Sequence, residues 1–189
     1  GKVIGDRGAF QAEMNRALRF VLGLAVPVAL LLLAARDVLV RLVFSEEFLE
    51  MIPLMVWTIP ADVLAIVMGL LRIAVLASTD NRAFVVLGVG FEVVYALCFV
   101  VGLEMFGLQG AVASYAVSAL IGIVIFGGYL VRLGLVRVPR GIWTRFGAGW
   151  VLLLSACLMP LSPFTRALFV LAAALWFMAE RNELKRAFS

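Results

Sequence analysis

The stretch MIPLMVWTIPADVLAIVMGLLRIAVLA, residues 51–77, decides the fold class of this protein. It is almost entirely apolar and carries only two charged side chains, Asp62 and Arg72. A helix that crosses the hydrocarbon core of a membrane needs about 20 mostly apolar residues. This stretch exceeds that length, so it predicts a membrane-spanning helix.

Further apolar runs of the same kind lie on both sides of this stretch, and no long Ser/Gly linker separates them. Together they predict a single transmembrane domain with an all-α fold, a polytopic bundle of about six transmembrane helices. The last two runs are shorter, and a shallow hairpin is the alternative for them. The expected spans are 17–43, 51–77, 83–103, 108–131, 143–161 and 164–180.

The composition agrees with a membrane protein and argues against a soluble enzyme. Hydrophobic residues make up 65% of the 189 residues and charged residues 15%, with a mean hydropathy of +1.12. A soluble domain is about half apolar and about a quarter charged. The net charge of +4 comes from basic residues between apolar runs, and no aromatic–basic recognition motif accompanies them, so no nucleic-acid partner is expected.

Enzymatic and metal chemistry find little support in the residue types. Histidine is absent, which excludes His-based triads and His metal sites. Cys98 and Cys157 lie inside apolar runs and are interpreted as packing residues. Since no P-loop, dinucleotide fingerprint or nucleophile–base set is present, we expect no catalytic residue, metal or cofactor.

The distribution of Lys and Arg predicts the orientation, because cytoplasmic loops of membrane proteins are enriched in these residues. Twelve basic residues fall on one side of the expected spans and three on the other, Arg36, Arg41 and Arg166. Both termini are therefore expected in the cytoplasm, in a multi-pass protein of the inner (plasma) membrane. The twelve are Lys2, Arg7, Arg16, Arg19, Arg82, Arg132, Arg137, Arg140, Arg145, Arg181, Lys185 and Arg186.

The second and third expected spans contain three charged residues: Asp62, Arg72 and Glu92. Charge at this depth is costly, so such residues usually face a bundle interior or a watery cavity. From the turn near Asp80, Arg72 lies roughly 10 Å deep, Glu92 roughly 15–18 Å and Asp62 roughly 25 Å. Arg72 and Glu92 are candidates for an ion pair, which is either structural or part of a site where Arg72 meets an anionic substrate. Asp62 or Glu92 would then bind a coupling ion.

A stripe of small residues runs along the expected fourth span. Gly110, Ser114, Ser118 and Gly122 recur every four residues and therefore share one helix face. Small residues let helix backbones approach closely in lipid. We interpret the stripe as a helix-packing surface, with sliding during a conformational change as the alternative.

Several segments resemble a known family. VLVRLVFSEEF, residues 38–48, follows an apolar helix containing Pro27, and PADVLAIVMGLLRIAVLAST, residues 60–79, precedes the polar turn TDNR. FGLQGAVASY, residues 106–115, then opens another helix. Over about residues 16–131 this order resembles the polysaccharide-biosynthesis flippases of the multidrug/oligosaccharidyl-lipid/polysaccharide flippase superfamily.

The resemblance implies a C-terminal portion of a two-lobed transporter, with the N-terminal half as its partner. The implied activity is flipping of a lipid-linked oligosaccharide, a polyprenyl-diphosphate glycan, for polysaccharide biosynthesis. Arg72 is then the candidate for binding the diphosphate. Two alternatives remain open: a drug/cation antiporter of the same superfamily, which would favour an acidic cavity, and a non-transporting membrane subunit or scaffold.

Overall fold

The computed structural model of the protein describes residues 7–43, 46–78, 81–160 and 162–188, and every element in these ranges is a helix. The all-α prediction is therefore confirmed. Five of the helices are long and apolar enough to cross a membrane. In chain order the elements are α1 (Arg7–Val43), η1 (Glu46–Met51), α2 (Ile52–Ser78), α3 (Asn81–Arg132), α4 (Arg140–Leu158) and α5 (Pro163–Phe188).

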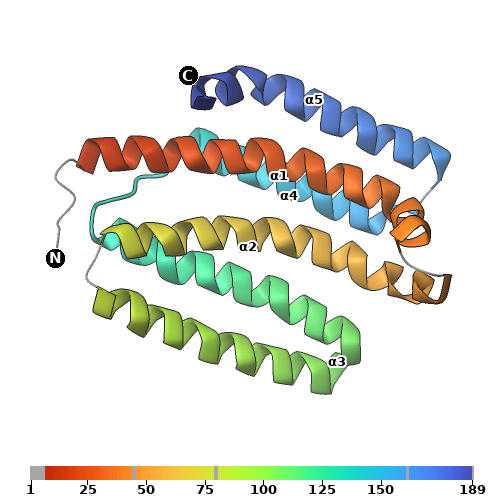
Figure 1. Ribbon diagram of the computed structural model, residues 1–189, viewed down its shortest axis with the longest axis horizontal. Helices are drawn as coiled ribbons and strands as arrows, with labels where there is room; N and C mark the ends of the chain where they lie inside the picture. The colour runs from red at the N-terminus through yellow and green to blue at the C-terminus, as the bar shows by residue number, and fades with distance from the viewer. Residues whose placement is uncertain (1–6, 44–45, 79–80, 161, 189) are drawn as a thin grey trace.

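The helices run roughly along one long axis (Figure 1). The first residues of α1, the last of α2, both ends of α3 and the first of α4 lie at the same end of the bundle, on the left of Figure 1. These are the chain ends and connections that carry most of the basic residues. Residue 161, the expected end of the fifth span, and Lys2 lie outside the described residues.

Helix α1 starts earlier than the apolar run predicts. It contains 37 residues and begins at Arg7, whereas the expected span begins at residue 17. At 1.5 Å per residue it is about 55 Å long, well beyond the hydrocarbon thickness of about 30 Å. Its first turns bury Met14 and Leu18 in a cluster with α2 and α3. Tertiary packing therefore extends the helix beyond its apolar part.

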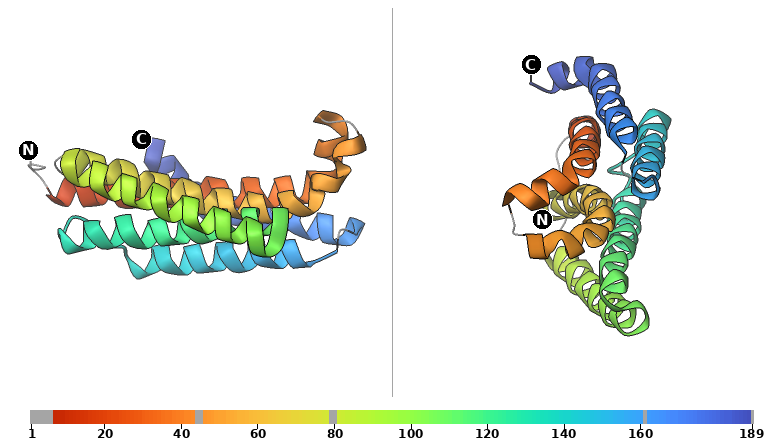
Figure 2. Two further views of the ribbon diagram at one scale, coloured as in Figure 1. Left: turned by 90° about the horizontal axis from the view of Figure 1, so that it is seen from below. Right: turned by 90° about the vertical axis from the view of Figure 1, so that its right-hand side faces the viewer.

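Helix α3 is bent back on itself at Gly107. Its two arms, 81–106 and 108–132, lie side by side and antiparallel (Figure 2). Gly107 has φ 62° and ψ −146°, a backbone region that is essentially restricted to glycine. The expected third and fourth spans fall in these two arms, and the short turn expected between them is this single bend.

Replacing Gly107 by alanine should destabilise the protein by about 1–3 kcal/mol, because alanine must adopt this strained conformation. The measurement is the thermal unfolding midpoint of the purified protein in detergent. Gly90→Ala is the matched control, since a Cβ there meets nothing within 4 Å and alanine favours a helix. Equal midpoints for the two variants would contradict this account of the bend.

Helix α2 lies at the centre of the arrangement, between α1 and the two arms of α3, while α5 packs along α1 and α4 packs on α1 and α2. One apolar cluster joins α1, α2 and α3 at the left end and includes Leu71 and Phe126. A second cluster joins α1, α2, α4 and α5 and includes Leu30 and Leu153. These contacts leave much apolar surface at the outside of the bundle.

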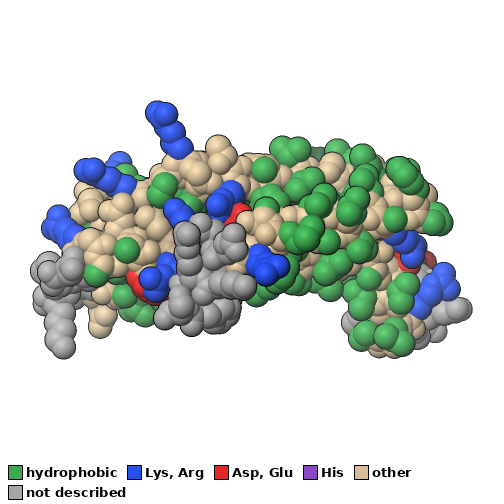
Figure 3. Space-filling view, turned by 90° about the horizontal axis from the view of Figure 1, so that it is seen from above, with side chains coloured by type: hydrophobic (Ala, Val, Ile, Leu, Met, Phe, Trp, Pro, Cys, Tyr) green, Lys and Arg blue, Asp and Glu red, His purple; other side chains and the backbone are tan. Residues whose placement is uncertain are grey.

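The surface has the pattern of a protein in lipid. Large apolar side chains such as Val124 and Ile73 are 73% and 64% exposed, which is costly over a wide area in water. On the face drawn in Figure 3, hydrophobic side chains cover much of the right-hand part. Lys and Arg side chains gather towards the left-hand end, with a smaller group at the right-hand end.

Candidate functional site

The first group of candidate residues lies where α2 meets the first arm of α3. Arg72 Nη1 donates a hydrogen bond to Glu92 Oε1 at 3.0 Å. The guanidinium carbon lies 5.7 Å from the centroid of the Phe84 ring. A Cβ added at Gly88 would lie 3.5 Å from Arg72 Nη2. The structure therefore brings Arg72 and Glu92 together.

The first arm of α3 is shaped to receive this arginine. Phe84, Gly88 and Glu92 are four residues apart, so they form one row along one helix face. Phe84 provides an aromatic face, Gly88 leaves room for the guanidinium, and Glu92 supplies the counter-charge. A cation on an aromatic ring and a carboxylate is held in a defined orientation.

Asp62 belongs to a second group of residues, which lies farther along α2 from Arg72. Its carboxylate lies close to the Tyr115 hydroxyl in the second arm of α3, near enough for the two groups to interact. The Tyr115 ring meets Tyr95 edge-on, with centroids 6.4 Å apart and planes at 77°. Ten residues separate Asp62 from Arg72, about 15 Å along α2. The structure therefore does not bring the two candidates together.

Sequence reasoning found no partner for Asp62 and missed both tyrosines. The available signal was that a tyrosine within an apolar helix carries a hydroxyl that normally finds a hydrogen-bond partner. Tyr95 lies three residues after Glu92, so it occupies the next turn of the same arm. The tyrosines thus continue the polar row from the Arg72–Glu92 pair towards Asp62.

The charged side chains of Asp62, Arg72 and Glu92, which lie where α2 meets α3, are partly exposed. The side chains of Arg72 and Glu92 are 34% and 56% exposed, and Asp62 is exposed on a face of α2 that also carries Ile66 and Ile73. A carboxylate that faces lipid at this depth is costly. In a membrane, this face would need either further protein or a water-filled cavity beside it.

The small-residue stripe of the second arm is buried. Gly110, Ser114, Ser118 and Gly122 all lie inside the contact of this arm with the first arm and α2. A Cβ at Gly122 would lie 2.8 Å from Met68 Cγ and Phe91 Cε2. The Ser114 and Ser118 hydroxyls donate to carbonyls one turn back, at 2.7 and 3.0 Å. The stripe thus lets three helical segments pack closely.

Other charges pair at the two ends of the bundle. Arg145 Nη1 lies 2.6 Å from Glu180 Oε2, and the side chain of Glu180 is only 8% exposed. Arg166 donates to Asp37 at 2.5 Å, and Asp37 also lies 3.9 Å from Arg36 Nε. The Arg145–Glu180 and Arg166–Asp37 pairs each join α5 to another helix, which gives these residues a structural role.

Comparisons with models of protein families, with curated proteins and with solved structures each found no match.

Proposed function

We propose that this chain is part of a transporter that flips a polyprenyl-diphosphate-linked oligosaccharide from the cytoplasmic to the outer leaflet of the cytoplasmic membrane. One observation carries the proposal: within apolar helices, Arg72 is oriented by Glu92 and Phe84 yet keeps a third of its side chain exposed. An exposed guanidinium at this depth suits an anionic group, and its forked donors match phosphate oxygens. The resemblance of residues 16–131 to polysaccharide flippases supports the same substrate class.

In this mechanism the Glu92 carboxylate holds Arg72 between turnovers. The arriving diphosphate competes with Glu92 for the guanidinium. Glu92 accepts a hydrogen bond from Nη1, so other N–H donors of Arg72 remain for phosphate oxygens. Departure of the diphosphate on the outer side restores the pair. Asp62 with Tyr115 is the candidate coupling-ion site, because a carboxylate beside a single hydroxyl retains lone pairs for a proton or cation.

The proposed topology has six spans, with each arm of α3 crossing the membrane separately. The 81–106 and 108–132 arms are each longer than the roughly 20 residues that a span requires. The basic connections share one end of the bundle, and the excess of basic residues supports a cytoplasmic location for that end. The bend at Gly107 and the α4–α5 connection then lie outside.

Cysteine labelling in a Cys98→Ala, Cys157→Ser background tests this topology. Phe106→Cys and Met159→Cys, at positions 69% and 40% exposed, should react with an impermeant maleimide added to intact cells. Gly141→Cys, at an exposed position where a Cβ meets nothing within 4 Å, should react only after permeabilisation. Protection of Phe106→Cys from the maleimide in both intact and permeabilised cells would contradict the six-span topology.

The exposed face of α2 that carries Asp62 supports the proposal that this chain has a partner, namely the rest of a two-lobed transporter. In a closed cavity between two lobes, Asp62, Arg72 and Glu92 would meet water and substrate instead of lipid, which lowers the cost of keeping them charged. The stripe of small residues is occupied by contacts within this chain, so it offers little support to a scaffold that assembles through it.

A drug/cation antiporter is the second candidate, and the Asp62–Tyr115 contact favours it, because a carboxylate attracts cationic drugs. Arg72 also lies where α2 meets α3, and its positive charge argues against a cationic substrate. Glycan export by cells that carry Arg72→Ala distinguishes the candidates. Export at the wild-type rate would refute the flippase proposal.

A further inference from the structure

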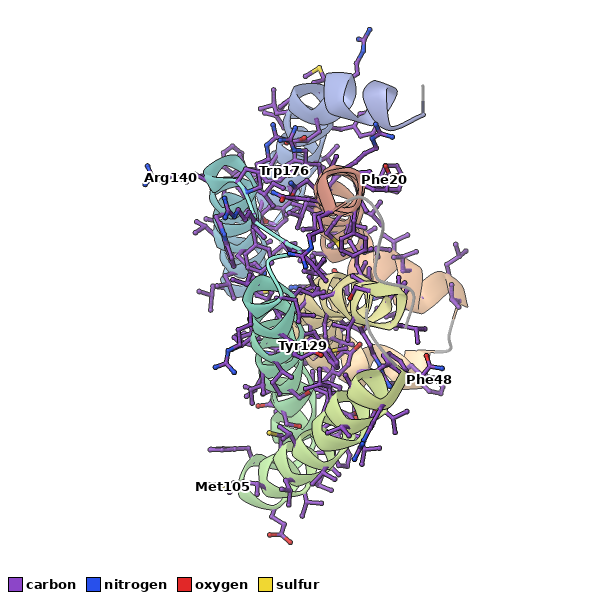
Figure 4. All side chains as sticks on the ribbon, turned by 90° about the vertical axis from the view of Figure 1, so that its left-hand side faces the viewer. Phe20, Phe48, Met105, Tyr129, Arg140 and Trp176 are labelled. Carbon is purple, nitrogen blue, oxygen red and sulfur yellow. The ribbon has the colours of Figure 1, made fainter. Side chains whose placement is uncertain are left out.

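An apolar pocket of about 340 Å³ lies between the second arm of α3 and α4. Its floor includes Leu18 of α1 and Leu71 of α2, and its sides include Val124 and Gly128 on α3 and Trp143 on α4. Ligand pockets range from about 300 to 1,000 Å³, so this one suits a slender occupant. Figure 4 shows the second arm of α3, marked by Tyr129, and the start of α4, marked by Arg140, on the same side of the bundle.

The pocket opens sideways, towards the region that lipid would occupy. Val124, Val131 and Trp143 line it and are 73%, 56% and 56% exposed. Val124 lies eight residues before the end of α3 and Val67 eleven residues before the end of α2, which corresponds to depths of about 12 and 16 Å. One leaflet contributes about 15 Å of hydrocarbon. The pocket therefore has the depth of one acyl chain of one leaflet.

The mouth of the pocket at the basic end of the bundle is positively charged. Arg132, Arg137 and Arg140 are exposed, and Arg132 and Arg137 directly adjoin lining residues. None of these three arginines forms an ion pair with another residue that the structure describes. The sequence contains no Asp or Glu between Glu104 and Glu180. Arg140 points away from the helices in Figure 4.

We propose that this pocket binds one acyl chain of an anionic phospholipid of the cytoplasmic leaflet, whose phosphate contacts Arg132, Arg137 and Arg140. The charge of the mouth matches an anionic headgroup, and the apolar walls match the chain. This assignment rests on the proposed orientation but not on the transported substrate. Leu71 lines the pocket while the neighbouring Arg72 contacts the first arm of α3, so the lipid and the proposed diphosphate occupy different sides of α2.

Lipid titration of the delipidated full-length protein in neutral detergent tests the proposal. The probes are phosphatidylglycerol and phosphatidylcholine with identical chains, and native mass spectrometry and the thermal midpoint report binding. Phosphatidylglycerol should bind more tightly and raise the midpoint further. Changing all three arginines to glutamine should reduce this preference by about tenfold to a hundredfold, whereas Arg82→Gln, at the same end of the bundle, should preserve it.

The pocket itself is tested by Gly128→Leu. A Cβ at Gly128 meets nothing within 4 Å, so the added side chain can fill the pocket and should weaken binding at least about tenfold. Gly90→Leu is the matched control, because Gly90 is also an exposed helical glycine with open space but lies outside the pocket. Trp143→Ala removes a wall residue that is more than half exposed and should weaken binding as well. It tests the pocket even where Gly128→Leu does not fold.

Three results would overturn the assignment: equal affinity for the two lipids, unchanged binding by Gly128→Leu and Trp143→Ala, or one-for-one displacement of phosphatidylglycerol by a polyprenyl diphosphate. The last would assign the pocket to the transported lipid. These measurements require no glycan export, so a failure of the proposed function leaves the lipid result interpretable.

Discussion

Replacing Arg72 by alanine is expected to reduce glycan export strongly while the protein remains inserted at close to normal abundance. Hydrogen bonds to charged groups contribute about 1.5–3 kcal/mol, so losing the guanidinium should reduce export by about tenfold to more than a hundredfold. Abundance should change little, because the proposed cavity hydrates both partners, which keep exposed surface, and hydrated pairs contribute about 0–1 kcal/mol. The measurement is complementation of export in cells, with immunoblotting of the membrane fraction.

Charge matters in this role, so Arg72→Lys should retain part of the export, and Arg82→Ala, at an exposed position near the start of the same arm, should retain all of it. Glu92→Ala should reduce export less than Arg72→Ala, because the arginine remains but loses its orienting contact. The Arg72→Ala, Glu92→Ala double mutant is decisive. A structural pair predicts that both single variants lose abundance and that the double mutant regains abundance and activity. An active double mutant would therefore rule out contact between Arg72 and the substrate.

Replacing Gly110 by alanine should prevent the two arms of α3 from packing as they do. A Cβ at Gly110 would overlap the carbonyl oxygen of Gly102 and lie 2.7 Å from its carbonyl carbon. Backbone cannot rotate out of the way as a side chain can, so the arms must separate. Overpacking costs about 1–3 kcal/mol and occasionally more, and a rigid backbone contact belongs at the upper end. The thermal midpoint and the monodisperse yield in detergent should both fall.

Gly90→Ala again provides the control, because it makes the same substitution in the first arm where a Cβ meets open space. Gly102→Ala should resemble Gly110→Ala, since its Cβ would lie 2.5 Å from the Gly110 carbonyl oxygen. A Gly110→Ala protein as stable as Gly90→Ala would show that the arms do not pack in this register.

Much of the fold could be predicted because lipid imposes a simple rule on the chain. A segment without water must satisfy its own backbone, so long apolar runs become helices, and those runs are visible in the sequence. The Arg72–Glu92 contact could be predicted from the sequence for a related reason. The residues lie 20 positions apart on consecutive antiparallel helices, so counting 1.5 Å per residue from the shared turn brings both to similar depths.

The tertiary structure alone decided which helix faces meet. Sequence sets the depth of a residue along its own helix, but rotation and choice of neighbour depend on packing between distant segments. The hydrogen bond between Arg166 and Asp37 joins residues 129 positions apart, and the Tyr115–Asp62 contact crosses from the second arm of α3 to α2. The sequence spacing within a single helix does not predict either of these two contacts.

The sequence by itself therefore indicated a multi-helix protein suited to a membrane, with a basic end and three charged residues at calculated positions along two helices, because composition and length along each helix are local properties. Only the tertiary structure decided that Arg72 contacts Phe84 and Glu92, that Asp62 lies beside Tyr115, and that α4 and the second arm of α3 enclose an apolar pocket. The physical reason is that each of these features requires two or more helices to present particular faces to one another, and close packing of small and large side chains selects those faces.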